Sequence, residues 1–93
     1  MSLETLTESV RTKVAGGGID ESVKFNLGDT GQIFVQGSTV TNDDADADCT
    51  VNITPDDLQE LLSGELNPTA AFMGGKITVD GDMNVAMKLG QIV

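Results

Sequence analysis

A single cysteine and the absence of histidine decide how this chain must hold itself together. Cys49 has no partner for an internal disulfide, and no Cys/His cluster is present that could hold a structural zinc ion. With 93 residues, the chain lies near the small end of what folds unaided. Because apolar residues make up 39% of it, its stability must come from a hydrophobic core. We predict one domain spanning residues 1–93.

The charge of the chain restricts its partners. Fifteen Asp and Glu residues against five Lys and Arg give a net charge of −10. Nucleic-acid phosphates are bound by clustered Lys and Arg, so we expect no nucleic-acid binding. The apolar runs are too short to cross a bilayer, and neither end of the sequence resembles a signal peptide or a peroxisomal address. We therefore expect a cytoplasmic location.

The chain is poor in groups that could transfer protons or act as nucleophiles. It contains no His and no Tyr, which leaves Asp, Glu, Lys and Cys. Cys49 would need a nearby cation or base to become a thiolate, and its neighbours Asp46 and Asp48 should raise its pKa instead. No Asp or Glu falls on a predicted apolar face. We predict that the protein is not an enzyme and needs no cofactor.

The acidic stretch from Asp43 to Asp48 resembles a calcium-binding loop in composition only. If Asp44 were the first ligand, Cys49 would stand where the loop needs a glycine. Pro55 would stand where it needs a bidentate Glu. The sequence therefore predicts a solvated acidic loop and no metal site.

Apolar periodicity predicts both helices and strands. Strand-like alternation and short turns favour an antiparallel sheet, with helices packed on one face, in the α+β class. Thr54-Pro55 and Asn67-Pro68 are typical helix starts, and Gly64 is a typical helix stop. The predicted order is a helix from Leu3 to Val14, strands at 23–27, 33–35 and 47–53, helices at 55–63 and 69–73, a strand at 77–79, and a last helix that Asp82 caps and that runs to about Gly90 or beyond.

The last predicted helix is unusually apolar. Its polar residues Asn84, Lys88 and Gln91 form one narrow stripe, and apolar residues cover the rest. A helix packed on one side needs an apolar stripe of only roughly 100°. The pattern leaves two interpretations open: the helix is enclosed on several sides, or it lines a space that something apolar fills.

Three sequence blocks resemble the sterol carrier protein 2 domain family. They are Ala47-Asp48-Cys49-Thr50-Val51, then Gly64-Glu65-Leu66-Asn67-Pro68 followed by Ala71-Phe72 and Gly75-Lys76-Ile77, and finally Gly81-Asp82-Met83 with Ala86-Met87-Lys88-Leu89. The match covers roughly half of the chain, and the spacing between the blocks also fits. The chain is similar to a short, stand-alone, bacterial-type member of this family.

The resemblance implies a five-stranded, mainly antiparallel sheet with helices on one face, enclosing an apolar cavity. It also implies binding or transfer of an apolar lipid (a fatty acid, a phospholipid, an acyl-CoA or a sterol-like molecule) without chemistry. Only Lys76 and Lys88 would help to hold a CoA head group. The alternative is an accessory, protein-interacting domain with a fully packed core, acting beside lipid-metabolism enzymes.

The resemblance and the side-chain pattern together predict the residues that line the ligand site. A monomer and a homodimer both fit the pattern, as does transient contact with a membrane. The predicted lining residues are Val51, Ile53, Leu58, Leu61, Leu62, Phe72, Met73, Ile77, Met83, Met87 and Leu89.

Overall fold

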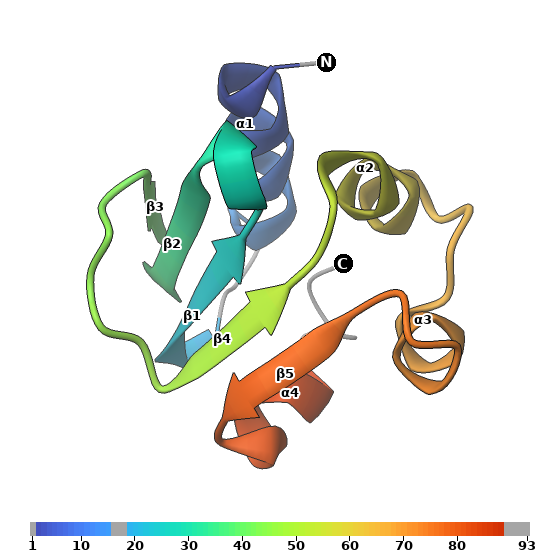
Figure 1. Ribbon diagram of the computed structural model, residues 1–93. Coiled ribbons are helices and arrows are strands. Elements are labelled where there is room, and N and C mark those ends of the chain that lie inside the picture. Colours follow the sequence, from blue (N-terminus) through green and yellow to red (C-terminus); the bar gives the residue numbers. More distant parts are fainter. Residues whose placement is uncertain (1, 16–18, 89–93) are drawn as a thin grey trace.

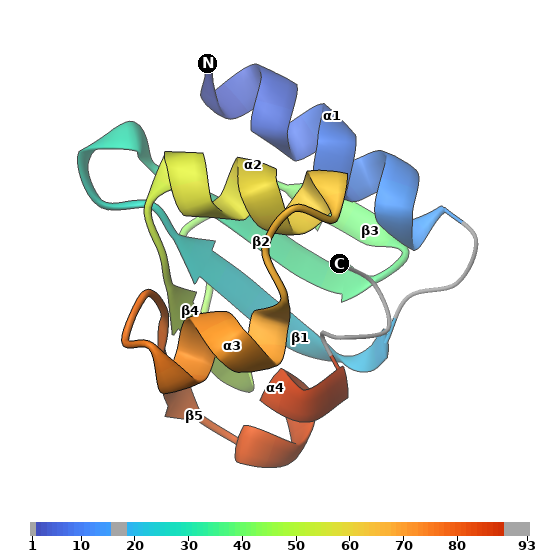
Figure 2. The same ribbon diagram turned by 90° about the vertical axis from the view of Figure 1, so that its right-hand side faces the viewer.

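A five-stranded sheet with all its helices on one face forms the described part of the chain, in a computed structural model that describes residues 2–15 and 19–88. The helices cover one face of the sheet and leave the other open (Figures 1 and 2). The elements are α1 (Leu3–Val14), β1 (Ile19–Asn26), the 3-10 turn η1 (Gly28–Thr30), β2 (Gln32–Gly37), β3 (Thr39–Thr41), β4 (Cys49–Asn52), α2 (Pro55–Ser63), α3 (Pro68–Met73), β5 (Thr78–Gly81) and α4 (Met83–Lys88).

The strand order is β3-β2-β1-β4-β5. Three of the pairings, β1–β2, β2–β3 and β4–β5, are antiparallel, whereas β1–β4 is parallel. The predicted α+β class, with a five-stranded, mainly antiparallel sheet and helices on one face, is confirmed. Alternation alone did not reveal β3, because this three-residue strand contains a single apolar residue, Val40.

Strand alternation separates a buried face from an open face. Phe25 on β1 pairs with Ile33 on β2 and Val51 on β4, and all three side chains are buried beneath the helices. Asn26, the next residue, points to the open face, where its Nδ2 donates to Asn52 Oδ1 at 2.9 Å. One face of the sheet is thus apolar and the other carries polar side chains.

The helices begin and end where the capping residues predict. The Thr54 side chain accepts a hydrogen bond from the backbone N–H of Asp57 at the start of α2. Asn67 Oδ1 accepts from two backbone N–H groups at the start of α3. Gly64 ends α2 with a left-handed φ of 85°. These caps satisfy backbone groups that would otherwise lack partners.

Several strand bounds differ from the sequence prediction, most clearly the start of β4. Strand β4 begins at Cys49, not at Ala47, because Asp48 leaves the ladder and bonds to Ser22 at an irregularity of β1. Helix α4 begins at Met83, directly after the predicted cap Asp82, whose Oδ1 accepts from the backbone N–H of Asn84. The helix is described as far as Lys88, and its predicted extension to about Gly90 lies outside the described residues. In the described part of the chain, no helix is long and apolar enough to cross a bilayer.

Candidate functional site

An apolar layer fills the space between the sheet and the helices. It contains Phe25 and Val51 from the sheet, and Leu58 from α2, each no more than 1% exposed. Side chains at alternate strand positions and at three- and four-residue helix steps converge here. Six of the predicted lining residues belong to this one cluster of buried side chains: Val51, Ile53, Leu58, Leu61, Leu62 and Ile77.

Four other predicted lining residues face solvent. Phe72 and Met73 on α3 are 44% and 81% exposed, and Met83 and Met87 on α4 are 46% and 77% exposed. Among the described residues, these are the four exposed large apolar side chains, and we call them the exposed apolar residues. Leu89 lies outside the described residues. No contact with a ligand tests the predicted lining residues, so they stay a prediction.

The apolar layer also contains residues that the predicted site omitted. Leu6 and Val10 come from α1, Ile33 and Val35 from β2, and Val85 from α4. Their spacing was visible in the sequence as helix and strand periodicity, but the family resemblance was strongest in the second half of the chain. Val85 also shows how α4 is packed, because it is buried while Met83 and Met87 on the same helix are not.

The apolar layer contains little that could perform chemistry. Among the described residues, the buried polar side chains are Thr7 and Ser22, and no carboxylate is buried. Cys49 is fully buried, as the strand pattern predicted. Burial, followed by the nearby carboxylates of Asp82 and Asp80, raises the pKa of its thiol. The direction agrees with the sequence prediction, but Asp46 and Asp48 are not the cause.

The acidic loop is tied down by hydrogen bonds and one ion pair. Lys24 Nζ lies 2.9 Å from Asp44 Oδ1 on the open side of the sheet. Asp48 Oδ2 accepts from the backbone N–H of Ser22 at 3.0 Å, and Ser22 Oγ accepts from the N–H of Asp48 at 2.9 Å. Within the described ranges, no three acidic, Cys or His residues are grouped closely enough to hold a metal ion.

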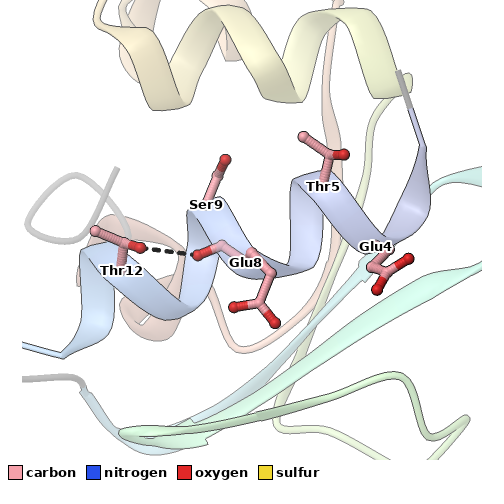
Figure 3. Close-up of a pocket in the computed structure, with 5 residues that line it drawn as sticks. All are labelled: Glu4, Thr5, Glu8, Ser9 and Thr12. Carbon is pink, nitrogen blue, oxygen red and sulfur yellow. Dashed lines mark hydrogen bonds between the residues drawn. The ribbon is translucent and has the colours of Figure 1, made fainter.

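A shallow depression lies on the outer side of α1 (Figure 3). It is lined by Glu4, Thr5, Glu8, Ser9 and Thr12. The Thr12 hydroxyl donates back to the Glu8 carbonyl within the same helix. Carboxylates and hydroxyls in this arrangement do not suit an apolar ligand. The outer side of α1 is therefore a hydrated surface, distinct from the apolar layer beneath the helix.

One ion pair joins α4 to the first strand. Lys88 Nζ lies 2.7 Å from Glu21 Oε2 and donates to both carboxylate oxygens. The hydrogen bond to Glu21 raises the pKa of Lys88, with smaller effects from Glu21, Asp20 and Asp82 as charges. Lys88, one of the two lysines predicted to help hold a CoA head group, is thus already paired with a carboxylate.

The fold and the site define a class of protein: a small α+β domain in which helices cover the apolar face of an otherwise polar sheet. The sequence model of the SCP-2 sterol transfer family matches residues 2–93. The chain therefore belongs to the SCP-2 sterol transfer family. The family prediction made from the three sequence blocks is confirmed.

Individual proteins show the same relationship. Sterol carrier protein 2 of Oryctolagus cuniculus is 46% identical over 54 residues, which cover 58% of this chain but 10% of the rabbit protein. Sterol carrier protein 2 like 2 from Aedes aegypti superposes with a TM-score of 0.82 at 24% identity, covering 100% of this chain and 97% of the mosquito chain. The palmitated form of SCP2L2 from Aedes aegypti gives a TM-score of 0.78 at 25% identity, covering 99% and 94%.

Proposed function

We propose that this domain binds a single apolar lipid chain beneath its helices and holds it without chemistry. The observation that carries the proposal is the family match, which extends over residues 2–93. The apolar layer supports it, because binding driven by buried apolar area needs a continuous apolar surface and few polar groups. The absence of a buried carboxylate among the described residues agrees with a role in which no bond is made or broken.

A long-chain fatty acid such as palmitate is the ligand class that we favour. A related solved structure is described as palmitated, and it resembles this chain over nearly its whole length. Acyl-CoA is less suitable, because its phosphates need cations and Lys88 is already paired with Glu21. The net charge of −10 adds a general repulsion against a polyanionic head group.

The apolar cavity, with walls formed by the predicted lining residues, is part of this proposal. The six buried lining residues would contact the lipid chain, and half-exposed Phe72 and Met83 would contact it where it meets solvent. Adaptable thioethers at that end suit ligands of different shape. Cytoplasmic location and the state of association stay predictions.

Native mass spectrometry of the purified protein, followed by organic extraction, tests the proposal directly. We expect an adduct of fatty-acid mass, or uptake of palmitate by the delipidated protein. Palmitate at about 100 times its dissociation constant should add about 2.7 kcal/mol to the free energy of unfolding. If no lipid class binds, the accessory, protein-interacting role replaces the carrier role.

Two Phe→Ala variants locate the ligand. Phe72→Ala should weaken palmitate binding by about tenfold, because it removes much of one apolar side chain from the proposed contact. Phe34 lies on the open face of the sheet, where it pairs with Lys24 and Thr41. Phe34→Ala should leave palmitate affinity unchanged. Equal losses in both variants would show that the ligand does not lie on the helix side.

A further inference from the structure

Most of the positive charges of the chain are already paired with carboxylates. Three of the five cations form ion pairs, which are Arg11–Glu8, Lys24–Asp44 and Lys88–Glu21. Lys13 and Lys76 are exposed and form no ion pair with any residue that the structure describes. Within the described ranges, these two lysines are therefore the cations that would meet an anionic group without first releasing a carboxylate of the protein.

Lys76 lies at the edge of the apolar layer, in the turn between α3 and β5 (Figure 1). Its backbone N–H donates to the carbonyl of Ala71 at 2.9 Å, and Ile77 follows it directly. Ala71 and Ile77 are 0% and 8% exposed, and both belong to the cluster of buried side chains that forms the apolar layer. The backbone of exposed Lys76 is thus held between two members of that layer.

The half-exposed side chain of Phe72 connects this turn with the proposed ligand. Phe72 directly follows Ala71 on α3, and its carbonyl accepts from the backbone N–H of Gly75 at 3.2 Å. We have placed Phe72 where the lipid chain meets solvent. A carboxylate must stay in contact with water or with a cation while its chain is buried. The head group of a fatty acid would therefore leave the protein beside the turn that carries Lys76.

We propose that Lys76 binds the carboxylate of a single-chain fatty acid whose hydrocarbon chain lies in the apolar layer. The inference rests on the proposed lipid-binding function and adds the head group that the site selects. An ammonium group donates charge-assisted hydrogen bonds to a carboxylate, whereas the hydroxyl of a sterol or a fatty alcohol brings no charge. The four-carbon stem of a lysine lies along apolar surface while its ammonium stays in water, which suits this edge position.

The other lysines do not offer the same arrangement. Lys13 follows Ser9 by four residues on α1, so both lie on the side of the helix that carries the hydrated depression. Glu4 and Glu8 line that depression and would repel a further carboxylate. Lys88 donates to both carboxylate oxygens of Glu21 and would have to give up this partner.

The distribution of charge along the chain favours the same position. Thirteen of the fifteen acidic residues and three of the five basic residues lie in residues 1–65, which carry the whole charge of −10. Residues 66–93 contain two acidic and two basic residues, so their net charge is zero. An anionic head group beside Lys76 therefore meets the less acidic part of the chain.

Two ligands with the same hydrocarbon chain test the assignment, since palmitate ends in a carboxylate and 1-hexadecanol in an uncharged hydroxyl. Lys76→Gln should weaken palmitate binding about fivefold, the effect of one exposed ion pair, and leave hexadecanol binding unchanged. Lys76→Arg keeps the charge and should bind palmitate as the wild type does. Displacement of a fluorescent apolar probe without a carboxylate measures each affinity in the delipidated protein.

Lys13→Gln is the matched control, because it removes the other exposed lysine without an ion pair among the described residues and changes the net charge equally. It should leave the ratio of palmitate to hexadecanol affinity at the wild-type value. If Lys13→Gln and Lys76→Gln weakened palmitate binding equally, the loss would come from net charge alone, and the proposal would be overturned.

Reversing the charge should give a larger effect. Lys76→Glu should weaken palmitate binding more than tenfold and strengthen binding of hexadecylamine, whose head group is cationic. Lys13→Glu, which changes the net charge by the same amount, should do neither to a comparable extent.

Two outcomes separate this inference from the proposed function. If palmitate and hexadecanol both bind and Lys76→Gln alters their affinities equally, the domain is a lipid carrier and the assignment of Lys76 is wrong. If neither ligand binds the delipidated wild type, the proposed function fails and the assignment of Lys76 fails with it.

Discussion

Residues 2–65 and residues 66–88 bury their apolar side chains to very different extents. Of the eighteen buried apolar residues in the described part of the chain, fifteen lie in the first region, and the second contributes Ala71, Ile77 and Val85. The second region also holds all four of the exposed apolar residues, Phe72, Met73, Met83 and Met87. The first region therefore supplies most of the hydrophobic core, and we call it the scaffold, whereas the second region keeps four large apolar side chains at the surface.

The two regions meet where β4 pairs with β5, and we call this contact and the residues that support it the seam. Cys49 on β4 pairs with Gly81 on β5, and the backbone N–H of Asp82 donates to the carbonyl of Asp48 at 2.9 Å. Asp48 is in turn held by Ser22 on β1. Substitutions within the scaffold, at the seam and at the surface should therefore differ in cost in that order.

Removing a side chain from the scaffold should have the largest effect. Phe25 is 1% exposed and packs between two neighbouring strands, so Phe25→Ala should lower the free energy of unfolding by about 3–5 kcal/mol. Met73→Ala in the second region should lower it by less than about 0.5 kcal/mol, because that side chain is 81% exposed. Urea unfolding measures both. Similar losses in the two variants would remove the distinction between the regions.

Adding a side chain at the seam should have the next largest effect. Gly81 has a φ of 105°, and a Cβ there would lie 2.5 Å from the carbonyl oxygen of Asp48. Gly81→Ala should therefore lower the free energy of unfolding by about 2–4 kcal/mol, from backbone strain and steric overlap together. Gly64→Ala is the control, because φ at Gly64 is 85° but no atom lies close to the added Cβ. We expect it to lower the free energy of unfolding by about 1 kcal/mol. Thermal and urea unfolding of both variants would show whether the steric overlap with the Asp48 carbonyl oxygen lowers stability beyond the effect of backbone strain alone.

Removing the Ser22 hydroxyl, which supports Asp48 at the seam, should lower the free energy of unfolding by less. Ser22 is 8% exposed, and its Oγ is the acceptor for the Asp48 N–H. Ser22→Ala should lower the free energy of unfolding by about 1–2 kcal/mol, because that N–H loses its partner. Ser63→Ala removes an exposed hydroxyl that bonds to Glu60 within α2 and should change stability by less than about 0.5 kcal/mol. Equal losses of unfolding free energy in Ser22→Ala and Ser63→Ala would show that water replaces the hydroxyl of Ser22 at little cost.

The sequence predicted local structure better than the pairing of strands that lie far apart in the chain. Caps at Thr54 and Asn67, the stop at Gly64 and the alternation through Val51 are local signals, and each was sufficient to place an element. The parallel pairing of β1 with β4 is not local, because it depends on how the segment between β3 and β4 crosses the sheet. Strand β3 was too short and too polar to show a period.

The candidate site shows the same limit. Periodicity identified which residues of α2 are apolar, and the structure buries them all. For α4, the wide apolar face left both enclosure and the lining of a space open, and it did not predict that Val85 would be buried while Met83 and Met87 are exposed. A pattern of apolar residues reports which side chains avoid water in some state of the protein. It does not report whether protein or lipid removes them from water.

The ion pair between Lys88 and Glu21 joins the two regions at the surface, and breaking it should have the smallest effect. Glu21→Gln should lower the melting temperature slightly, and high salt should abolish the difference, since the side chains of Lys88 and Glu21 are 45% and 27% exposed. The pKa of Lys88 is raised above its ordinary value in the folded state, chiefly by its hydrogen bond to Glu21. The pair therefore contributes its full stability below the ordinary lysine pKa and loses it as the pH rises through the higher folded-state pKa.

The melting temperatures of the wild type and Glu21→Gln should accordingly converge at strongly alkaline pH. Glu8→Gln is the matched control, because Glu8 pairs with Arg11 within α1 and the guanidinium stays charged across this range. The difference in melting temperature between Glu8→Gln and the wild type should remain constant as the pH rises. If both differences changed alike with pH, the alkaline loss would come from the rest of the protein, and the ion pair would contribute nothing to the connection between scaffold and surface.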